Sequence, residues 1–334
     1  YKRQERYTLG ESNRYHGTEG ELDVTHIEMK YPISEAYIEA AVSAGIPRNE
    51  DINGEVQEGI GYMQVNMRGG KRWSSADAFL SPDVRKRTNL RIGLRAWVRR
   101  VLFEGKRAVG VEYEDDKGRI HQARARAEIV LCAGAYNSTP LLEMSGVGRA
   151  DLLESLGVQK LHELPGVGEN LQDHFQLWLQ QGVKTKNTLS EDGKFPRLVF
   201  NVLRYLLTKK GALAFPAANI GAFVRSERGG RPIFQIHFTP GAGKMDEEGN
   251  MVASEKPGVN STCCVIRPTS RGSVHARSLD PTEAPRILHN FLETEHDREL
   301  SLEGFKLQRK IYAQPAFQEQ ATEELVPGPS VQSD

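Results

Sequence analysis

The chain has little cysteine, no long hydrophobic run and no excess of charge of either sign. Its three cysteines, Cys132, Cys263 and Cys264, form no CxxC pair, which argues against a disulfide framework or a zinc site and favours a reducing compartment. No apolar run approaches the ~20 residues of a membrane-spanning helix. Lys+Arg and Asp+Glu balance at 44 each, so no basic excess points to nucleic acid as a partner. The 334 residues, 38% of them hydrophobic, suffice for one large or two ordinary globular domains.

Local patterns predict several elements. Residues 32–44 have the periodicity of a helix, for which we expect Ser34 as the N-cap and Gly45 as the end. Two alternating runs flank Asp115-Asp116-Lys117-Gly118 and predict a hairpin with this turn. Further helices are expected at residues 196–209 and from about 295 to 313, and strands at 233–240, 262–268 and 272–278.

The stretch "EIVLCAGAYNSTPLLEMSGVG", residues 128–148, has the densest pattern. Its apolar residues 129–132 predict a strand buried on both faces, with Cys132 as a small core residue. The tiny residues that follow lead into a helix, for which we expect Asn137 or Ser138 as the cap and Pro140 in the first turn. Such a turn brings backbone N–H groups close to a ligand, but ordinary strand-to-helix connections have the same pattern.

Six segments in order carry a family resemblance. "GAYNSTPLLEMSGVG" and the later "LPGVGENLQDH" are similar to a signature of the glucose–methanol–choline (GMC) flavin oxidoreductases and to the loop after it, although Thr139-Pro140 departs from the usual order. The other four are "YHGTEGELDV", "GKRWSSADAFL", "RVLFEGKRAVGVEY" and "IRPTSRGSVHARSLDP". The resemblance covers nearly the whole chain, and the bacterial choline and alcohol dehydrogenases are the most similar branch.

The resemblance implies an α/β plus α+β fold. A partial FAD-binding Rossmann-type domain is expected at residues 75–160, and an antiparallel-sheet substrate domain at 14–74 and 161–334. The implied activity is FAD-dependent oxidation of an alcohol to an aldehyde by hydride transfer to the flavin. The family's GxGxxG and His-Pro-x-Gly-Thr segments are absent, so we expect a central fragment without a catalytic residue. The alternative is a non-catalytic binding module that kept the fold.

The resemblance also implies site residues. Val98 matches a position whose backbone meets the adenine, and Ala133 and Gly134 match small residues beside the adenosine–diphosphate half of FAD. Asn219 stands where many relatives have an acidic residue, which favours a neutral primary alcohol over choline as the substrate. His174 and Asn170 are expected to satisfy backbone groups of their loop rather than to line the cofactor cleft.

The resemblance leaves the electron acceptor open among oxygen, a quinone and another carrier. We expect a cytoplasmic protein. The amphipathic stretch "FPRLVFNVLRYLLTKK" is compatible with peripheral membrane contact, but we favour a helix that covers the substrate domain.

Overall fold

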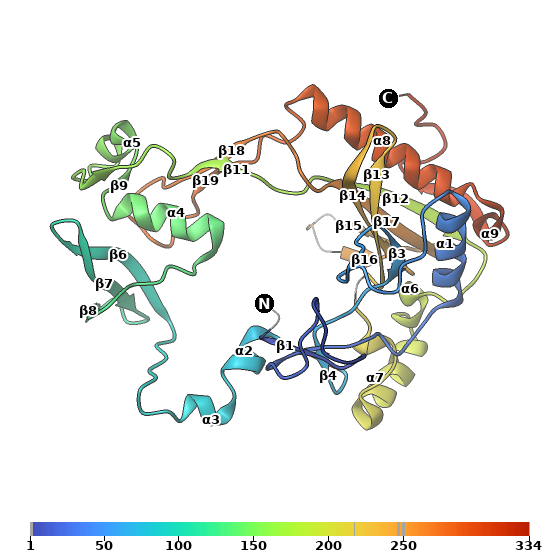
Figure 1. Cartoon of the computed structure of the whole chain (residues 1–334), viewed down its shortest axis with the longest axis horizontal. Helices are drawn as coiled ribbons and strands as arrows, with labels where there is room; N and C mark the ends of the chain where they lie inside the picture. The colour runs from blue at the N-terminus through green and yellow to red at the C-terminus, as the bar shows by residue number, and fades with distance from the viewer. Residues whose placement is uncertain (1–2, 217, 246–247, 249–250, 334) are drawn as a thin grey trace. The chain divides into compact units, whose positions relative to one another are not determined.

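The computed structural model describes residues 3–216, 218–245, 248 and 251–333, and the chain divides into two compact units (Figure 1). Unit 1 comprises Tyr1–Arg87, His174–Arg267 and His296–Asp334, and unit 2 comprises Thr88–Asp173 and Pro268–Glu295. These bounds differ from those of the predicted domains, because residues 161–173 and 268–295 group with unit 2 and residues 75–87 with unit 1. The assignment of the units to cofactor and substrate stays a prediction.

Unit 1 is built on a six-stranded antiparallel sheet, which confirms the expected sheet type. The strands, in their order across the sheet, are β20 (Ala321–Val326), β12 (Gln176–Val183), β17 (Gly258–Val265), β14 (Gly229–Thr239), β13 (Ile220–Ser226) and β3 (Gly59–Tyr62). Strands from three distant parts of the sequence therefore lie next to each other in one sheet.

The helices α1, α8 and α9 cover one side of this sheet, and β16 lies toward the other (Figure 1). The helices of unit 1 are α1 (Pro32–Ser43), α2 (Ser75–Phe79), α3 (Pro82–Arg85), α6 (Leu189–Asp192), α7 (Arg197–Thr208), the 3-10 turn η1 (Ala212–Ala214), α8 (Glu295–Tyr312, whose first residue groups with unit 2) and α9 (Pro315–Gln318). Its short strands are β1 (Glu5–Tyr7), β2 (Leu22–Val24), β4 (Met67–Arg68), β5 (Lys71–Arg72), β15 (Gly243–Met245) and β16 (Met251–Ala253).

The core lies between the sheet and the helices α1, α8 and α9. Along β14 every second residue, Phe234, Ile236 and Phe238, is almost fully buried, as the two-residue period of a strand requires. Tyr37 of α1 stacks on Phe238 with 4.1 Å between the ring centroids, and Phe317 of α9 lies edge-on to Tyr37. Burial of each such side chain stabilises the fold by roughly 1.5–3 kcal/mol.

Unit 2 contains a three-stranded antiparallel sheet of β6 (Ala96–Glu104), β7 (Arg107–Asp115) and β8 (Ile120–Arg124). The predicted hairpin is confirmed, and Asp115 holds its turn by accepting hydrogen bonds from the N–H groups of Lys117 and Arg119. The other elements are α4 (Gly134–Met144), β9 (Val147–Gly148), α5 (Ala150–Ser155), β10 (His162–Glu163), β11 (Glu169–Leu171), β18 (Gly272–His275) and β19 (Arg286–Leu288).

The expectations for residues 129–140 are wrong in two respects. Residues 129–132 form no strand, Val130 is 71% exposed, and Cys132 is exposed rather than in a core. A strand buried on both faces needs neighbours that pair its backbone groups, and no described strand of unit 2 pairs with this segment. Helix α4 begins at Gly134 without a side-chain cap, so Pro140 lies inside the helix and not in its first turn.

Helix α1 also differs from expectation. Tyr31 is the N-cap of α1, because Pro32 fixes the first helical position, and Ser34 is buried inside the helix. Helix α7 packs on unit 1 with its polar side, whereas Phe200 and Leu207 on its apolar side are 65% and 85% exposed. Among the described residues, no helix combines the length and hydrophobicity needed to cross a membrane.

Candidate functional site

A cavity of about 510 Å³ in unit 2 contains two of the three predicted cofactor residues. Val98 of β6 and Ala133, directly before α4, both line it, together with Trp97 and the apolar segment 129–132. Val98 pairs with Tyr113, and the register of β6 shifts between Val98 and Arg100. Such a bulge leaves an extra residue outside the regular ladder. The structure thus brings together residues that lie 35 positions apart in the sequence.

Gly134 lies at the start of α4 beside this cavity. Its φ of +78° requires glycine, and a Cβ built on it would meet no atom within 4 Å. The first turn of α4 has no side-chain cap and no acidic residue, so the N–H groups at this helix start have no side-chain acceptor. An uncapped helix start attracts anions, because its N–H groups and the helix dipole both favour negative charge.

A second cavity, of about 420 Å³, lies on the face of the six-stranded sheet of unit 1 that points away from α1, α8 and α9, and Leu189 and Ser190 of α6 also line it. Cross-strand partners line it in two rows: Trp178, Thr262 and His237 in one, and Gln180, Asn260 and Thr239 in the other. Their neighbours in sequence, such as Leu179, Ser261 and Phe238, point to the core. The sheet therefore has an apolar core face and a polar cavity face.

Two groups of this polar face are chemically distinctive. The Asn260 Oδ1 atom is buried and has no hydrogen-bond partner among the described residues, although a buried carbonyl oxygen normally accepts a hydrogen bond. Burial lowers the pKa of His237, and repulsion from His174 lowers it further, so the ring is neutral at neutral pH. None of the described residues that line this cavity is Asp or Glu.

Asn219, the predicted substrate residue, lies outside this set. It is fully buried directly before β13, and its Nδ2 donates a hydrogen bond to the Ser34 Oγ of α1 at 3.0 Å. Its neighbour Ala218 lines the cavity on the sheet, whereas Asn219 does not. The Asn219 side chain thus lies on the side of the sheet that faces α1, opposite the polar face. Its assignment to substrate binding stays a prediction.

His174 contacts a backbone group, as expected, and the role expected of Asn170 stays a prediction. His174 Nε2 lies 3.3 Å from the carbonyl oxygen of Ile266 within unit 1. Asn170 lies in β11 of unit 2 with a φ of +60°, a conformation that asparagine tolerates better than most residues. Neither residue lines the two cavities described above.

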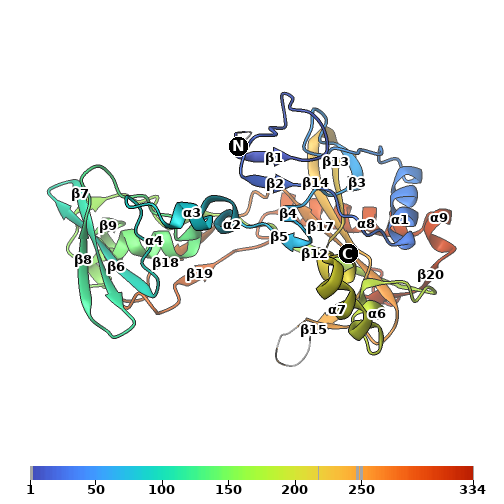
Figure 2. The same cartoon turned by 90° about the horizontal axis from the view of Figure 1, so that it is seen from below.

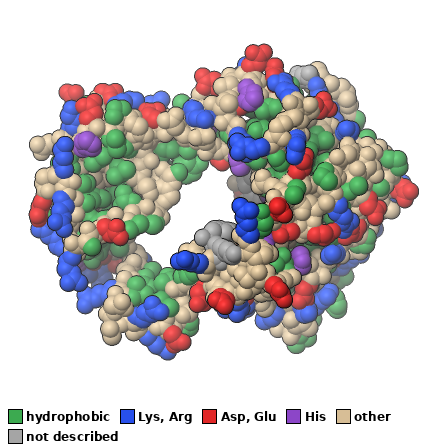
Figure 3. Space-filling view, in the orientation of Figure 1, with side chains coloured by type: hydrophobic (Ala, Val, Ile, Leu, Met, Phe, Trp, Pro, Cys, Tyr) green, Lys and Arg blue, Asp and Glu red, His purple; other side chains and the backbone are tan. Residues whose placement is uncertain are grey.

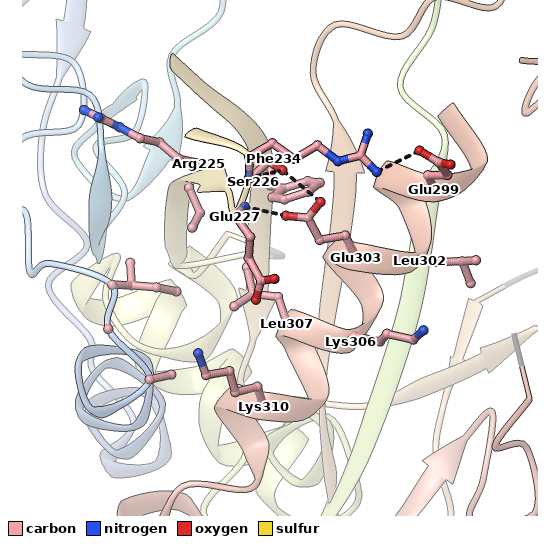
Figure 4. A pocket seen from close by; sticks show the side chains of 15 residues that line it. Arg225, Ser226, Glu227, Phe234, Glu299, Leu302, Glu303, Lys306, Leu307 and Lys310 are labelled. Atoms are coloured by element: carbon pink, nitrogen blue, oxygen red, sulfur yellow. Dashed lines mark hydrogen bonds and ion pairs between the residues drawn. The ribbon is translucent and has the colours of Figure 1, made fainter. Parts of the chain in front are cut away.

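A third cavity, of about 560 Å³, lies between the β13–β14 turn and α8 (Figure 4). There Glu303 accepts hydrogen bonds from the Ser226 hydroxyl and the Glu227 N–H, at 2.8 and 2.7 Å, and Arg228 pairs with Glu299. These charged and polar groups bind one another and hold the turn on the helix. This cavity therefore looks like a structural junction rather than a site.

Sequence reasoning missed the polar sheet face. The alternation of "QLWLQQ" and "IFQIHFT" does indicate which residues share a face. It does not indicate which face is buried, or that β12, β14 and β17 are neighbours, because their pairing joins distant segments.

Comparison with known proteins places the chain in a family. The sequence profiles of the GMC oxidoreductases match residues 7–176 and 268–334. The chain is 40% identical over 335 residues to the mitochondrial choline dehydrogenase of Mus musculus, covering 100% of this chain and 55% of that protein. It is 37% identical over 340 residues to an alcohol dehydrogenase [acceptor] of Pseudomonas putida, covering 100% and 60%. The chain thus spans little more than half the length of these relatives.

Solved structures agree with this placement. A pyridoxine 4-oxidase from Mesorbium loti has a TM-score of 0.82 at 27% identity, over 99% of this chain and 60% of that one. A formate oxidase has a TM-score of 0.87 over 97% of this chain and 62% of that one, and at 19% identity it shows the fold alone. The family resemblance and the expected fold are thereby confirmed, and the chain belongs to the GMC oxidoreductase family.

Proposed function

We propose that the protein to which this chain belongs is an FAD-dependent oxidoreductase that oxidises a small neutral primary alcohol to an aldehyde. Bound FAD would supply the hydride acceptor, and electrons would pass on to oxygen, a quinone or another carrier. We assign no catalytic residue to this chain. Its contribution is to bind the adenosine part of the cofactor in unit 2 and to orient the alcohol on the polar sheet face of unit 1.

The cavity in unit 2 fits the chemistry of FAD. Val98, Trp97 and residues 129–132 offer an apolar wall against which an adenine ring packs. The uncapped start of α4 at Ala133 and Gly134 offers N–H donors to an anion such as the diphosphate. The GMC membership of the chain supports FAD as the cofactor.

The single observation that carries the substrate assignment is the uncharged polar wall of the sheet-face cavity, in which Asn260 lies between Gln180 and Thr239. An alcohol hydroxyl can donate to and accept from amide and hydroxyl groups of this kind. Trp178 and Leu189 supply apolar surface for a short carbon chain. Because no described lining residue is acidic, the cavity offers no charge partner for a quaternary ammonium group, which favours a neutral alcohol over choline.

The role of Asn219 is part of the proposal. Because its amide binds Ser34 on α1, we expect Asn219 to affect the substrate through the position of β13 and its neighbour Ala218. A residue in direct contact with substrate would change the preference between choline and neutral alcohols when it is replaced. One that acts through the backbone would change the turnover of both alike.

The test is steady-state oxidation of primary alcohols and choline by the whole protein with an artificial electron acceptor. We expect turnover of neutral alcohols, with Asn260→Ala raising the KM about fivefold because one hydrogen bond is lost. The matched control is Gln235→Ala, on the same sheet face but not among the lining residues; its KM should not change. A whole protein that binds FAD but oxidises none of the alcohols would instead favour the non-catalytic binding module.

A further inference from the structure

Glu143 of α4 is a fully buried carboxylate in unit 2, with an exposed fraction of 0%. Its Oε1 lies 2.7 Å from the His275 Nδ1, and its Oε2 accepts a hydrogen bond from the Ala276 N–H at 2.7 Å. A buried carboxylate destabilises a fold unless its oxygens have partners, and here both partners stand at the end of β18. Helix α4 and β18 are distant in the sequence but lie side by side in both views (Figures 1 and 2). Glu143 therefore ties the helix to the end of this strand.

The His275 ring is held from its other side as well. Its Nε2 lies 3.2 Å from the Glu169 Oε1 of β11, and Glu169 accepts a hydrogen bond from the Arg149 Nη1 at 3.1 Å. The ring also lies against the Gly168 backbone, since a Cβ on Gly168 would be 2.5 Å from the His275 Nδ1. Gly168 has a φ of +83°, which glycine adopts without strain. These contacts fix the orientation of the ring and with it the bond to Glu143.

The segment directly after this joint forms one wall of the unit 2 cavity. Side chains between Ala276 and Pro285 line the cavity, Asp280 and Glu283 among them, and we call residues 276–285 the second wall. The Ser278 hydroxyl donates to Glu283 at 2.5 Å, and its Oγ accepts from the Asp280 N–H at 3.1 Å. The second wall is thus held in shape by its own hydrogen bonds, so its position depends on how its ends are attached.

One of these attachments joins the second wall to α4. At its far end the second wall continues into β19, which pairs with β18. At its near end Ala276 is bound by Glu143. The same helix α4 contributes Pro140 and Leu141 to the opposite side of the cavity. Glu143 therefore links two sides of the cavity, and the separation of these sides should depend on it.

We propose that Glu143 and His275 are positioning residues for the cofactor, which hold the second wall at the separation from α4 that the adenosine part of FAD requires. The proposal rests on the cofactor site proposed above. Asp280 and Glu283 suit an adenosine, because carboxylates accept hydrogen bonds from hydroxyl and amino groups and repel a diphosphate. Glu143 and His275 are not among the lining residues, so they act through the wall. A wall already in place need not be ordered by the cofactor, which favours binding.

The test is the Kd for FAD, measured by flavin fluorescence on reconstitution of the whole protein. Glu143→Ala removes the bonds to His275 and Ala276, and we expect the Kd to rise at least roughly tenfold, because FAD must then order the second wall. His275→Ala leaves the bond to Ala276 in place, so the Kd should rise less, by about threefold. Glu143→Gln keeps an acceptor for the Ala276 N–H and a polar group for the imidazole, so its Kd should stay within about twofold of the unchanged protein.

The matched control for lost stability is Leu153→Ala. Leu153 of α5 is fully buried in unit 2 and is not among the residues that line the cavity. Its replacement should lower the free energy of unfolding and leave the Kd of the folded protein unchanged. An equal rise of the Kd in Leu153→Ala and Glu143→Ala would overturn the proposal, because loss of stability would then explain both. If Glu143→Ala does not fold, an unchanged Kd for His275→Ala overturns it instead.

The variant Ala133→Leu separates this inference from the cofactor site on which it rests. It places bulk in the cavity on the side of α4. If Ala133→Leu leaves the Kd unchanged, FAD binds elsewhere and both proposals are wrong. If Ala133→Leu raises the Kd while Glu143→Ala and His275→Ala do not, the cofactor site stands, and Glu143 and His275 do not position the cofactor.

Discussion

The imidazole of His16 stacks on the ring of Tyr7 with 4.0 Å between the ring centroids. In this position His16 is 2% exposed, and each of its ring nitrogens lies 3.0 Å from a carboxylate oxygen: Nδ1 from Glu5 and Nε2 from Asp51. Two carboxylate partners are best satisfied by an imidazolium, which donates from both nitrogens. His16 therefore ties β1 to the loop around Asp51.

The stability of the protein should depend on pH through this cluster. Burial by itself would lower the pKa of His16, but the hydrogen bonds that its ring donates to Glu5 and Asp51 outweigh burial and raise the pKa. A raised pKa in the folded state gives stability that is fully present below the ordinary pKa of about 6.5. That stability is lost as the pH rises through the raised value. Urea unfolding across this range should show the decline.

The variant His16→Gln should reduce this pH dependence. It should also lower the free energy of unfolding by about 3 kcal/mol, because the buried Glu5 carboxylate loses its charged partner. His26→Gln is the control, since His26 is exposed and its replacement should leave the pH profile unchanged. An identical pH profile for the unchanged protein and His16→Gln would contradict the assignment of the charge to His16.

Gly304 of α8 lies directly against the sheet. A Cβ at this position would lie 2.7 Å from the Cys263 Sγ and 3.3 Å from the Phe234 ring. We expect Gly304→Ala to destabilise the protein by about 1–2 kcal/mol, because the overpacking exceeds the gain in helix propensity. Gly93→Ala, whose Cβ would have nothing within 4 Å, should change the free energy of unfolding little. Equal thermal unfolding midpoints for both variants would contradict this packing.

Bulk at the start of α4 should weaken cofactor binding. Ala133 lines the unit 2 cavity and is exposed, so Ala133→Leu should narrow the cavity without loss of stability. We expect the Kd for FAD, measured by flavin fluorescence on reconstitution of the whole protein, to rise at least roughly tenfold, a change that corresponds to ~1.4 kcal/mol. Ala135→Leu, exposed but not among the lining residues, is the control. Equal FAD affinity of the two variants would place the cofactor elsewhere.

Replacement of Asn219 should lower the stability of the protein and leave its substrate preference unchanged. Asn219→Glu places a carboxylate where no surface is exposed, which should lower the free energy of unfolding by roughly 3 kcal/mol. Because the side chain faces Ser34, the ratio of choline turnover to neutral-alcohol turnover per folded molecule should stay unchanged. Chemical denaturation and steady-state kinetics on the soluble fraction separate the two effects. A clear gain in choline turnover would show that residue 219 reaches the substrate after all.

Local signals predicted the elements whose structure is set locally. The β7–β8 hairpin follows from its alternation and from the Asp115–Gly118 turn, and α8 from its periodicity. The predicted strand at residues 129–132 is wrong, because a strand needs pairing partners and the local pattern does not reveal whether they are present. The helix at residues 196–209 was predicted from its periodicity, which shows which side chains share a face but not which face meets solvent. Figure 3 shows hydrophobic side chains, in green, at the surface of the molecule.

The candidate site was also predicted only in part, because local patterns do not contain the pairing of distant strands. Val98, Ala133 and Gly134 stand in segments that resemble family signatures, and two of them line one cavity. The row of Gln180, Asn260 and Thr239 arises from the register of three strands far apart in the sequence. No local pattern contains that register, so these residues emerge only from the fold.

The central claim is that this chain binds part of an FAD cofactor and orients an alcohol for oxidation. The most direct measurement is the visible absorbance of the flavin in the whole protein, mixed with a primary alcohol under anaerobic conditions. The account predicts that the oxidised flavin spectrum bleaches with the alcohol, and more slowly at a subsaturating alcohol concentration for Asn260→Ala. A purified whole protein that holds FAD and keeps its oxidised spectrum with every primary alcohol would contradict it.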